Sequence, residues 1–138
     1  MLTERLAPRC AALLAIDVVD AALDRAHGRC RHLSQVCFAR SDLPRHAPEG
    51  PFDLIVLSEV LYYFDRLELA EIAAQVAAAA VPGATMLLVH WLGQTPDYPL
   101  TGDEAVAAFK AALPSVSLRR SKRTEQFRLD LLQVARAD

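Results

Sequence analysis

Polar and aromatic side chains end four apolar runs of the sequence. They are Asp17, Asp42, the pair Ser58 and Glu59, and the pair His90 and Trp91. Continuous apolar runs are typical of strands that are covered on both faces, as in parallel sheets. Because ligands bind beyond the carboxyl ends of such strands, we expect these six side chains at a ligand site.

Asp17 and Asp42 suggest a site for a nucleoside. A carboxylate at the end of one strand is placed to accept both hydroxyls of a ribose, and a carboxylate one unit later is placed to accept an exocyclic amine such as that of adenine. Two carboxylates would repel a pyrophosphate set close to them, so the pair favours an adenosine cofactor that carries no phosphate. The alternatives are structural: Asp17 simply ends a strand, and Asp42 forms a turn before Pro44.

A second group of residues has the types expected where an acceptor would bind. Glu59 comes after four apolar residues, and apolar surroundings would suit it to abstract a proton; His90 is the other candidate base. Tyr62, Tyr63 and Trp91 are candidate acceptor walls, and since two adjacent rings cannot both face the core, one tyrosine should face the ligand. The alternatives are a solvated loop acid at Glu59 and core positions for His90 and the rings.

The elements that position these side chains alternate between strands and helices. Strands are expected at 11–19, 36–38, 52–57 and 84–91. A helix capped by Asp20 should end near Gly28, and a second should carry an apolar stripe from Leu69 to Ala80 and stop at Pro82. Thr101 and Glu104 have capping-box spacing and predict a third helix that ends before Pro114.

The remaining segments complete an α/β pattern. The segments 116–119 and 127–134 predict an antiparallel hairpin, with Arg119, Arg120, Lys122 and Arg123 in or beside its turn. That basic group is interpreted as a solvated turn, with an anionic partner as the alternative. Together with an N-terminal helix, the order predicts a doubly wound, mostly parallel α/β sheet in a single domain over residues 1–138.

Composition excludes several classes of function. The net charge of −2 provides no general attraction to nucleic acid or to an anionic membrane. No apolar run reaches membrane-spanning length, and the N-terminus is not a signal peptide. The three cysteines, Cys10, Cys30 and Cys37, lack metal-binding spacing and indicate free thiols in the cytoplasm.

Three segments resemble the nodulation protein S family of class I S-adenosylmethionine-dependent methyltransferases. They are LTERLAPRC (2–10), LLAIDVVDAALDRA (13–26) and FDLIVLSEVLYYF (52–64), and the resemblance extends through VPGATMLLV to about residue 90. It implies a Rossmann-like methyltransferase fold, S-adenosyl-L-methionine as the cofactor, and methylation of N or O on a small-molecule acceptor, such as an amino sugar. It also implies roles in binding: Asp17 for the ribose, Val18 for the adenine face, and Asp42 for the adenine amine with Leu43 beside it. Ser58 and Glu59 would approach the methionine end and the acceptor.

The beginning of the chain departs from the family pattern. In the family, a strand and a GxGxG-like loop precede the helix that residues 2–10 resemble, and that strand lies between those ending here at Asp17 and Ser58. Met1 stands where the loop should end, and no two of the five glycines are close enough to form one. We therefore expect an N-terminally truncated chain that binds the cofactor weakly, with its two flanking strands separated by a gap or forced together.

Two other functions remain as hypotheses. A short, non-catalytic relative would expose apolar strand edges and serve as an interaction module, for instance in a homodimer. A nicotinamide-dependent oxidoreductase would also use Asp17 on a ribose, but it needs the same absent glycine fingerprint and leaves the segment 58–63 without a role.

Overall fold

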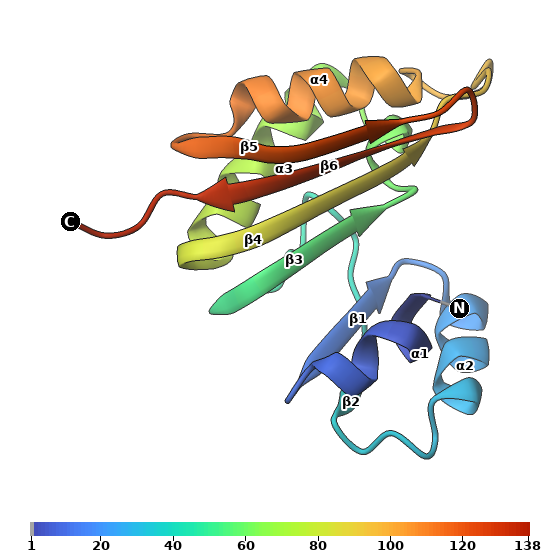
Figure 1. Ribbon diagram of the computed structural model, residues 1–138. Helices are drawn as coiled ribbons and strands as arrows, with labels where there is room; N and C mark the ends of the chain where they lie inside the picture. Colours follow the sequence, from blue (N-terminus) through green and yellow to red (C-terminus); the bar gives the residue numbers. More distant parts are fainter. Residues whose placement is uncertain (1) are drawn as a thin grey trace. The chain divides into compact units, whose positions relative to one another are not determined.

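The computed structural model describes residues 2–138, which form two compact units, Met1–His46 and Ala47–Asp138. The elements follow the order expected from the sequence (Figure 1). They are α1 (Leu2–Leu6), η1 (Ala7–Arg9), β1 (Leu13–Asp17), α2 (Asp20–Arg29), β2 (Val36–Arg40), β3 (Phe52–Ser58), η2 (Leu61–Tyr63), α3 (Arg66–Ala79), β4 (Ala80–Trp91), α4 (Gly102–Ala112), β5 (Val116–Arg123) and β6 (Phe127–Val134). The predicted alternation of strands and helices is confirmed.

In the first unit, a pair of parallel strands brings two carboxyl ends side by side. β1 pairs with β2 so that Asp17 lies opposite Arg40. Helix α2 begins at Asp20 itself, with Val19 in the capping position and no side-chain cap, so the prediction of Asp20 as the N-cap is wrong. The reason is local. The Asp17 side chain accepts a hydrogen bond from the backbone N–H of Val19 at 2.9 Å, and this turn starts the helix one residue earlier than a cap at Asp20 would.

The second unit is a four-stranded sheet with helices on one face. Its strand order is β3-β4-β6-β5; β3 and β4 are parallel, and β6 is antiparallel to both β4 and β5, which confirms the C-terminal hairpin. Figure 1 shows α3 and α4 over the same side of this sheet. The largest apolar side chains fully buried there are Leu61, Leu69, Ile72, Met86, Leu88, Val106, Phe109 and Leu132.

Strand alternation decides which side chains of β4 meet the helices. Met86, Leu88 and His90 are buried, whereas the intervening residues are partly exposed and Trp91 is exposed. Because successive side chains of a strand point to opposite faces, His90 and Trp91 lie on different faces of the sheet.

Two predicted boundaries are wrong. Helix α3 ends at Ala79, and Ala80 already belongs to β4. This strand continues through Pro82 and through Gly83, although Gly83 has a positive φ of 80°. Strand β5 extends to Arg123, so the basic residues lie on an edge strand, where charge hinders pairing with other chains. The turn itself is short and held by Thr124, whose Oγ1 accepts the N–H groups of Gln126 and Phe127 at 3.1 Å each.

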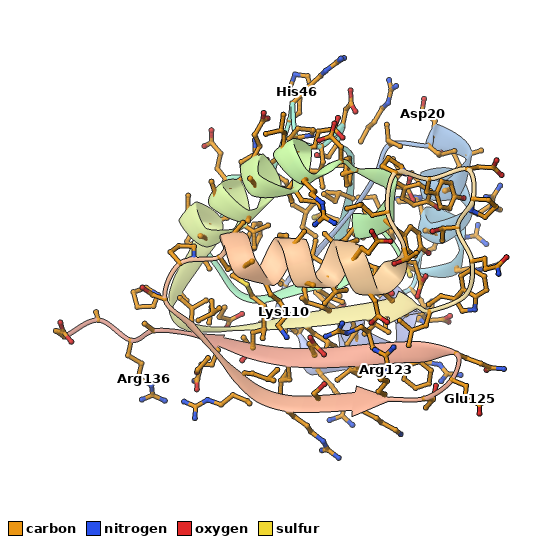
Figure 2. All side chains as sticks on the ribbon, turned by 90° about the horizontal axis from the view of Figure 1, so that it is seen from above. Asp20, His46, Lys110, Arg123, Glu125 and Arg136 are labelled. Atoms are coloured by element: carbon orange, nitrogen blue, oxygen red, sulfur yellow. The ribbon has the colours of Figure 1, made fainter. Side chains whose placement is uncertain are left out.

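A buried carboxylate ties α4 to the hairpin. The Asp130 side chain is completely buried and accepts hydrogen bonds from Lys110 Nζ (2.8 Å), Arg128 Nη2 (2.9 Å) and Ser121 Oγ (3.0 Å). In Figure 2, Lys110 points from α4 toward the strands. These cations hold the pKa of Asp130 below its ordinary value although burial acts to raise it. Such a charge needs all its partners, since removing one partner of a buried ion pair typically costs about 3–5 kcal/mol.

The strands ending at Asp17 and Ser58 belong to different sheets. Among residues 2–138, β1 pairs only with β2, and β3 pairs only with β4. β1 and β3 are therefore not paired with each other, and each keeps one edge unpaired.

Candidate functional site

The two acids expected to bind adenosine follow neighbouring strands of the first unit. Asp17 is the last residue of β1, and its backbone carbonyl accepts a hydrogen bond from Ser41 N at 3.0 Å, which fixes the chain just before Asp42. Oδ1 of Asp17 accepts a hydrogen bond from Val19 N at 2.9 Å, and within residues 2–138 Oδ2 accepts none. Each of the adjacent carboxyl ends of β1 and β2 is therefore followed or ended by a carboxylate. Asp17 is exposed, and Asp42 is half-buried.

The immediate neighbours of these acids leave them accessible. Asp42 lies 3.8 Å from Arg45 Nη1 in a local, solvent-exposed ion pair, which is a weak interaction that a ligand can replace. Val18 is exposed, and its carbonyl accepts a hydrogen bond from Arg40 Nε at 3.3 Å. Leu43 is half-buried beside Asp42. An exposed apolar side chain and a half-buried one thus accompany the two carboxylates.

In the second unit, Ser58 and Glu59 end a strand beside the end of β4. Ser58 lies opposite Val89 in the parallel ladder, and Glu59 N donates to the Val89 carbonyl at 2.9 Å. Glu59 has φ of 55°, in the left-handed region that costs a non-glycine residue on the order of 1 kcal/mol. Such strain is concentrated at functional sites. Glu59 is exposed, however, and not enclosed by apolar side chains as the sequence suggested.

Tyr62 holds the Glu59 carboxylate. Its hydroxyl donates a short hydrogen bond to Glu59 Oε2, and its ring is buried. Burial, followed by the hydrogen bond to Glu59 and its charge, raises the pKa of the Tyr62 phenol above its ordinary value, so Tyr62 stays protonated and acts as a donor. Within residues 2–138, Oε1 of Glu59 accepts no hydrogen bond, and the side chain is exposed. One carboxylate oxygen is therefore fixed while the other is available.

His90 anchors the turn that carries Tyr62. Its imidazole is completely buried, and Nε2 accepts hydrogen bonds from the backbone N–H groups of Leu61 (3.1 Å) and Val60 (3.3 Å), at the start of η2. Burial, and then the Arg128 charge, lowers the pKa of His90 to about 4, against a smaller opposing effect of Asp130. With its lone pair engaged by two amides, His90 positions η2 and is not placed to accept an acceptor's proton, contrary to the base hypothesis.

Aromatic rings gather around Tyr62, and one of them had not been anticipated. The Tyr62 ring contacts those of Tyr63 and His90 edge-on, with centroids 5.2 and 5.7 Å away. It also stacks against Tyr98, whose plane is only 7° from its own. Tyr62 is buried and Tyr63 is 49% exposed, in agreement with the expectation that only one of the two would face the core. Tyr98 lies in a loop without periodic pattern, so no sequence signal indicated it.

Trp91 takes no part in this group. Its ring lies against Gly93, where an added Cβ would come within 1.8 Å of Trp91 Cζ2, and only a glycine leaves room for it. The side chain is 45% exposed on the sheet face opposite to His90. The structure therefore brings together Glu59, Tyr62, Tyr63 and His90 but leaves Trp91 apart.

The described residues offer no other obvious chemistry. Among residues 2–138, no three His, Cys, Asp or Glu side chains are grouped as metal ligands. No helix in that range has both the length and the apolar character needed to cross a membrane.

Comparison with known proteins identifies relatives over most of the chain. The family model for nodulation protein S matches residues 1–87. Nodulation protein S of Rhizobium tropici is 37% identical over 86 residues, and that of Bradyrhizobium diazoefficiens is 34% identical over 86 residues. Each match covers 62% of this chain but only 36% and 41% of the respective relatives, so the chain spans well under half the length of these proteins.

Solved structures share the fold over nearly the whole chain. A protein from Pseudomonas syringae described as a methyltransferase has a TM-score of 0.83 and 30% identity, with 96% of this chain and 79% of that chain covered. The N-methyltransferase NodS from Bradyrhizobium japonicum, solved with S-adenosyl-L-homocysteine, has a TM-score of 0.82 and 22% identity, with 96% and 71% covered. The elements found here are thus those of a methyltransferase fold, and this chain belongs to the nodulation protein S family.

Proposed function

We propose that the chain takes part in transferring a methyl group from S-adenosyl-L-methionine to a nitrogen or oxygen of a small acceptor, an amino sugar or a similar metabolite, in the cytoplasm. The observation that carries the proposal is the pair of carboxylates, Asp17 and Asp42, at adjacent ends of parallel strands in a member of this family. Asp17 would bind the ribose hydroxyls through its free oxygen, and Asp42 the adenine amine. Val18 and Leu43 would contact the adenine ring, and Ser58 the methionine end.

Glu59 is the proposed proton acceptor. When bound, S-adenosyl-L-methionine would supply the methyl group and keep the electrons of the broken carbon–sulfur bond as a thioether. The acceptor nitrogen or oxygen then carries a surplus proton, which a nearby carboxylate can take up. Glu59 suits this role because Tyr62 fixes Oε2 and leaves Oε1 open, so the side chain is oriented and keeps one oxygen for the acceptor's proton. Tyr63 would form the exposed acceptor wall with the buried Tyr62 behind it, and His90 would hold η2 in place.

The proposal is tested by titrating the 138-residue chain with S-adenosyl-L-homocysteine and following its backbone amides by NMR. We expect shifts at Asp17, Val18 and Asp42, and a dissociation constant on the order of 1 mM, about −4 kcal/mol, because no glycine pair in this chain can form the loop that approaches the methionine portion. In Asp17→Asn and Asp42→Asn, the initial slope of the shifts should fall about tenfold, as expected for the loss of a charged hydrogen-bond acceptor.

Asp24→Asn is the matched control, because Asp24 is an exposed acid on α2 of the same unit. It should titrate like the wild type. Shifts that spare β1 and β2, or that are equally strong in all three variants, would contradict the assignment of the adenosine site. A low-micromolar affinity would contradict the expected weakness of binding.

A second candidate function is self-association without catalysis. Apolar side chains of the first unit are exposed, among them Leu14, Val18 and Val19, and β3 exposes Leu54 beside its unpaired edge. Such surfaces favour pairing with another chain. A homodimer predicts a concentration-dependent sedimentation coefficient that Leu14→Ser and Leu54→Ser each reduce to the monomer value. A constant monomer value across the micromolar range would exclude it.

A further inference from the structure

The loop between β4 and α4 is built to hold one tyrosine in a defined place. Within residues 92–101, Thr95 Oγ1 donates to the Leu100 carbonyl at 2.8 Å, and Tyr98 N donates to the Thr95 carbonyl at 3.1 Å. Thr95 and Leu100 are both buried, so these contacts close the loop on itself at a buried base. Tyr98 stands at the exposed part of the loop between them.

The position of the Tyr98 ring is fixed by two other rings. It is nearly parallel to Tyr62, at 5.5 Å between centroids, and meets Tyr63 edge-on at 4.7 Å. Tyr62 in turn donates its hydroxyl to Glu59. Tyr98 is therefore linked through a single ring to the carboxylate proposed as the proton acceptor.

Exposure separates the three tyrosines into one support and two contact residues. Tyr62 is buried, whereas Tyr63 is 49% and Tyr98 41% exposed. Tyr62 thus holds the arrangement from within, and the other two present ring surface to solvent beside an exposed carboxylate. Rings held rigidly in this way bind a flat, apolar molecular face at little entropic cost, and a carboxylate beside them selects a polar hydrogen-bond donor.

We propose that Tyr98 determines acceptor specificity, by stacking on acceptors whose nucleophilic group is attached to a ring. The inference rests on the proposed function, because it names a further residue of the same acceptor site. Acceptors that carry the same amine without a ring leave the Tyr98 surface unused and bind more weakly. The loop residues that hold Tyr98 thereby influence which amines are bound.

The test uses the whole 138-residue chain and two amines that differ in the ring, glucosamine and ethanolamine, with binding followed by ligand-observed NMR. The wild type should bind glucosamine more tightly than ethanolamine. Tyr98→Ala should weaken glucosamine binding about five- to tenfold, the range expected for one aromatic contact with its buried area, and leave ethanolamine binding unchanged. Tyr98→Phe keeps the ring and should bind glucosamine as the wild type does.

Asp97→Ala is the matched control, since Asp97 is the exposed neighbour of Tyr98 in the same loop. It should leave glucosamine binding unchanged. Tyr98→Leu serves if Tyr98→Ala disturbs the fold, because it keeps apolar bulk without a flat face and should show the same loss. Wild-type chain that does not bind glucosamine, or Tyr98 variants that bind it normally, would overturn the inference.

Titration with S-adenosyl-L-homocysteine distinguishes a failure of the Tyr98 inference from a failure of the proposed function. Asp17→Asn should weaken binding of S-adenosyl-L-homocysteine and leave the dependence of glucosamine binding on Tyr98 intact. If the cofactor analogue does not depend on Asp17 while Tyr98 still governs glucosamine binding, the methyl-transfer proposal fails and the Tyr98 inference stands. The opposite pattern overturns the Tyr98 inference alone.

Discussion

At the scale of single residues, His90 illustrates how a group that titrates near neutral pH becomes a structural part. Its Nε2 receives two backbone N–H groups, and Nδ1 is buried without a hydrogen-bond partner among residues 2–138. A protonated imidazole could no longer accept those N–H groups, so only the neutral ring fits this site. The start of η2, and with it the Tyr62 hydroxyl on Glu59, depends on that neutral state.

This dependence predicts a loss of stability in mild acid. The pKa of His90 is lowered from 6.5 to about 4 in the folded chain, so the unfolded chain binds the proton first. The contribution of His90 to the free energy of unfolding should therefore be nearly constant above pH 7 and fall as the pH decreases from 6.5 toward 4. Between pH 7 and pH 5, urea denaturation should show wild type losing about 2 kcal/mol more than His90→Gln, whose amide oxygen can accept the same N–H groups without titrating.

Subtracting the pH dependence of His90→Gln from that of the wild type removes the contributions of the other histidines, because both proteins contain them. Asp103 is no source of the difference either, because Arg123 and Arg128 lower its pKa to about 2 and its effect lies below pH 4. If His90→Gln does not fold, an NMR titration of the His90 ring in wild type gives the pKa directly. Equal pH dependence in both proteins, or a ring that titrates near 6.5, would contradict the prediction.

At the scale of secondary structure, the sequence predicted what is encoded locally. The capping box of Thr101 and Glu104 is present at the start of α4, with Glu104 N donating to Thr101 Oγ1 at 3.2 Å. The positions of Asp17 as the last residue of a strand and of Glu59 just after one were also predictable, because an apolar run reveals both the strand and its end. Both patterns depend on residues within a few positions of one another.

What could not be predicted depends on contacts between distant segments. Tyr98 gains its place from Tyr62, and Asp130 from Lys110, and neither pair lies within one element. The base hypothesis for His90 failed for the same reason: its Nε2 meets the amides of Val60 and Leu61, thirty and twenty-nine positions away. A strand end shows that a residue is near a site, but only tertiary packing shows which of its atoms remain free.

At the scale of the whole molecule, the two units differ in how much core each contains. In the first unit, only Ala7, Cys30 and Ser41 are buried among the described residues, and α2 buries no residue fully. The second unit buries large side chains such as Phe109 and Leu69. Full burial of one such side chain contributes about 1.5–3 kcal/mol. The first unit therefore gains much less free energy from apolar burial to offset the conformational entropy that it loses on folding.

The difference predicts that the first unit opens on its own. The amides of β1 and β2 should exchange hydrogen through openings whose free energy lies at least about 2 kcal/mol below that of β4 and β6 in the second unit. All four strands are hydrogen-bonded in parallel or antiparallel ladders, so the comparison is between similar amides that differ in the core behind them.

Hydrogen exchange measured by mass spectrometry, with urea below the unfolding range, separates local from global opening. The experiment should use dilute protein, so that self-association does not protect the exposed strands. Exchange of β1 and β2 that merges with that of β4 and β6 at every urea concentration would show one cooperative unit and contradict the expectation. A separate, faster class confined to the first unit would show that Asp17 and Asp42, the carboxylates proposed to bind adenosine, lie in the less stable part of the chain.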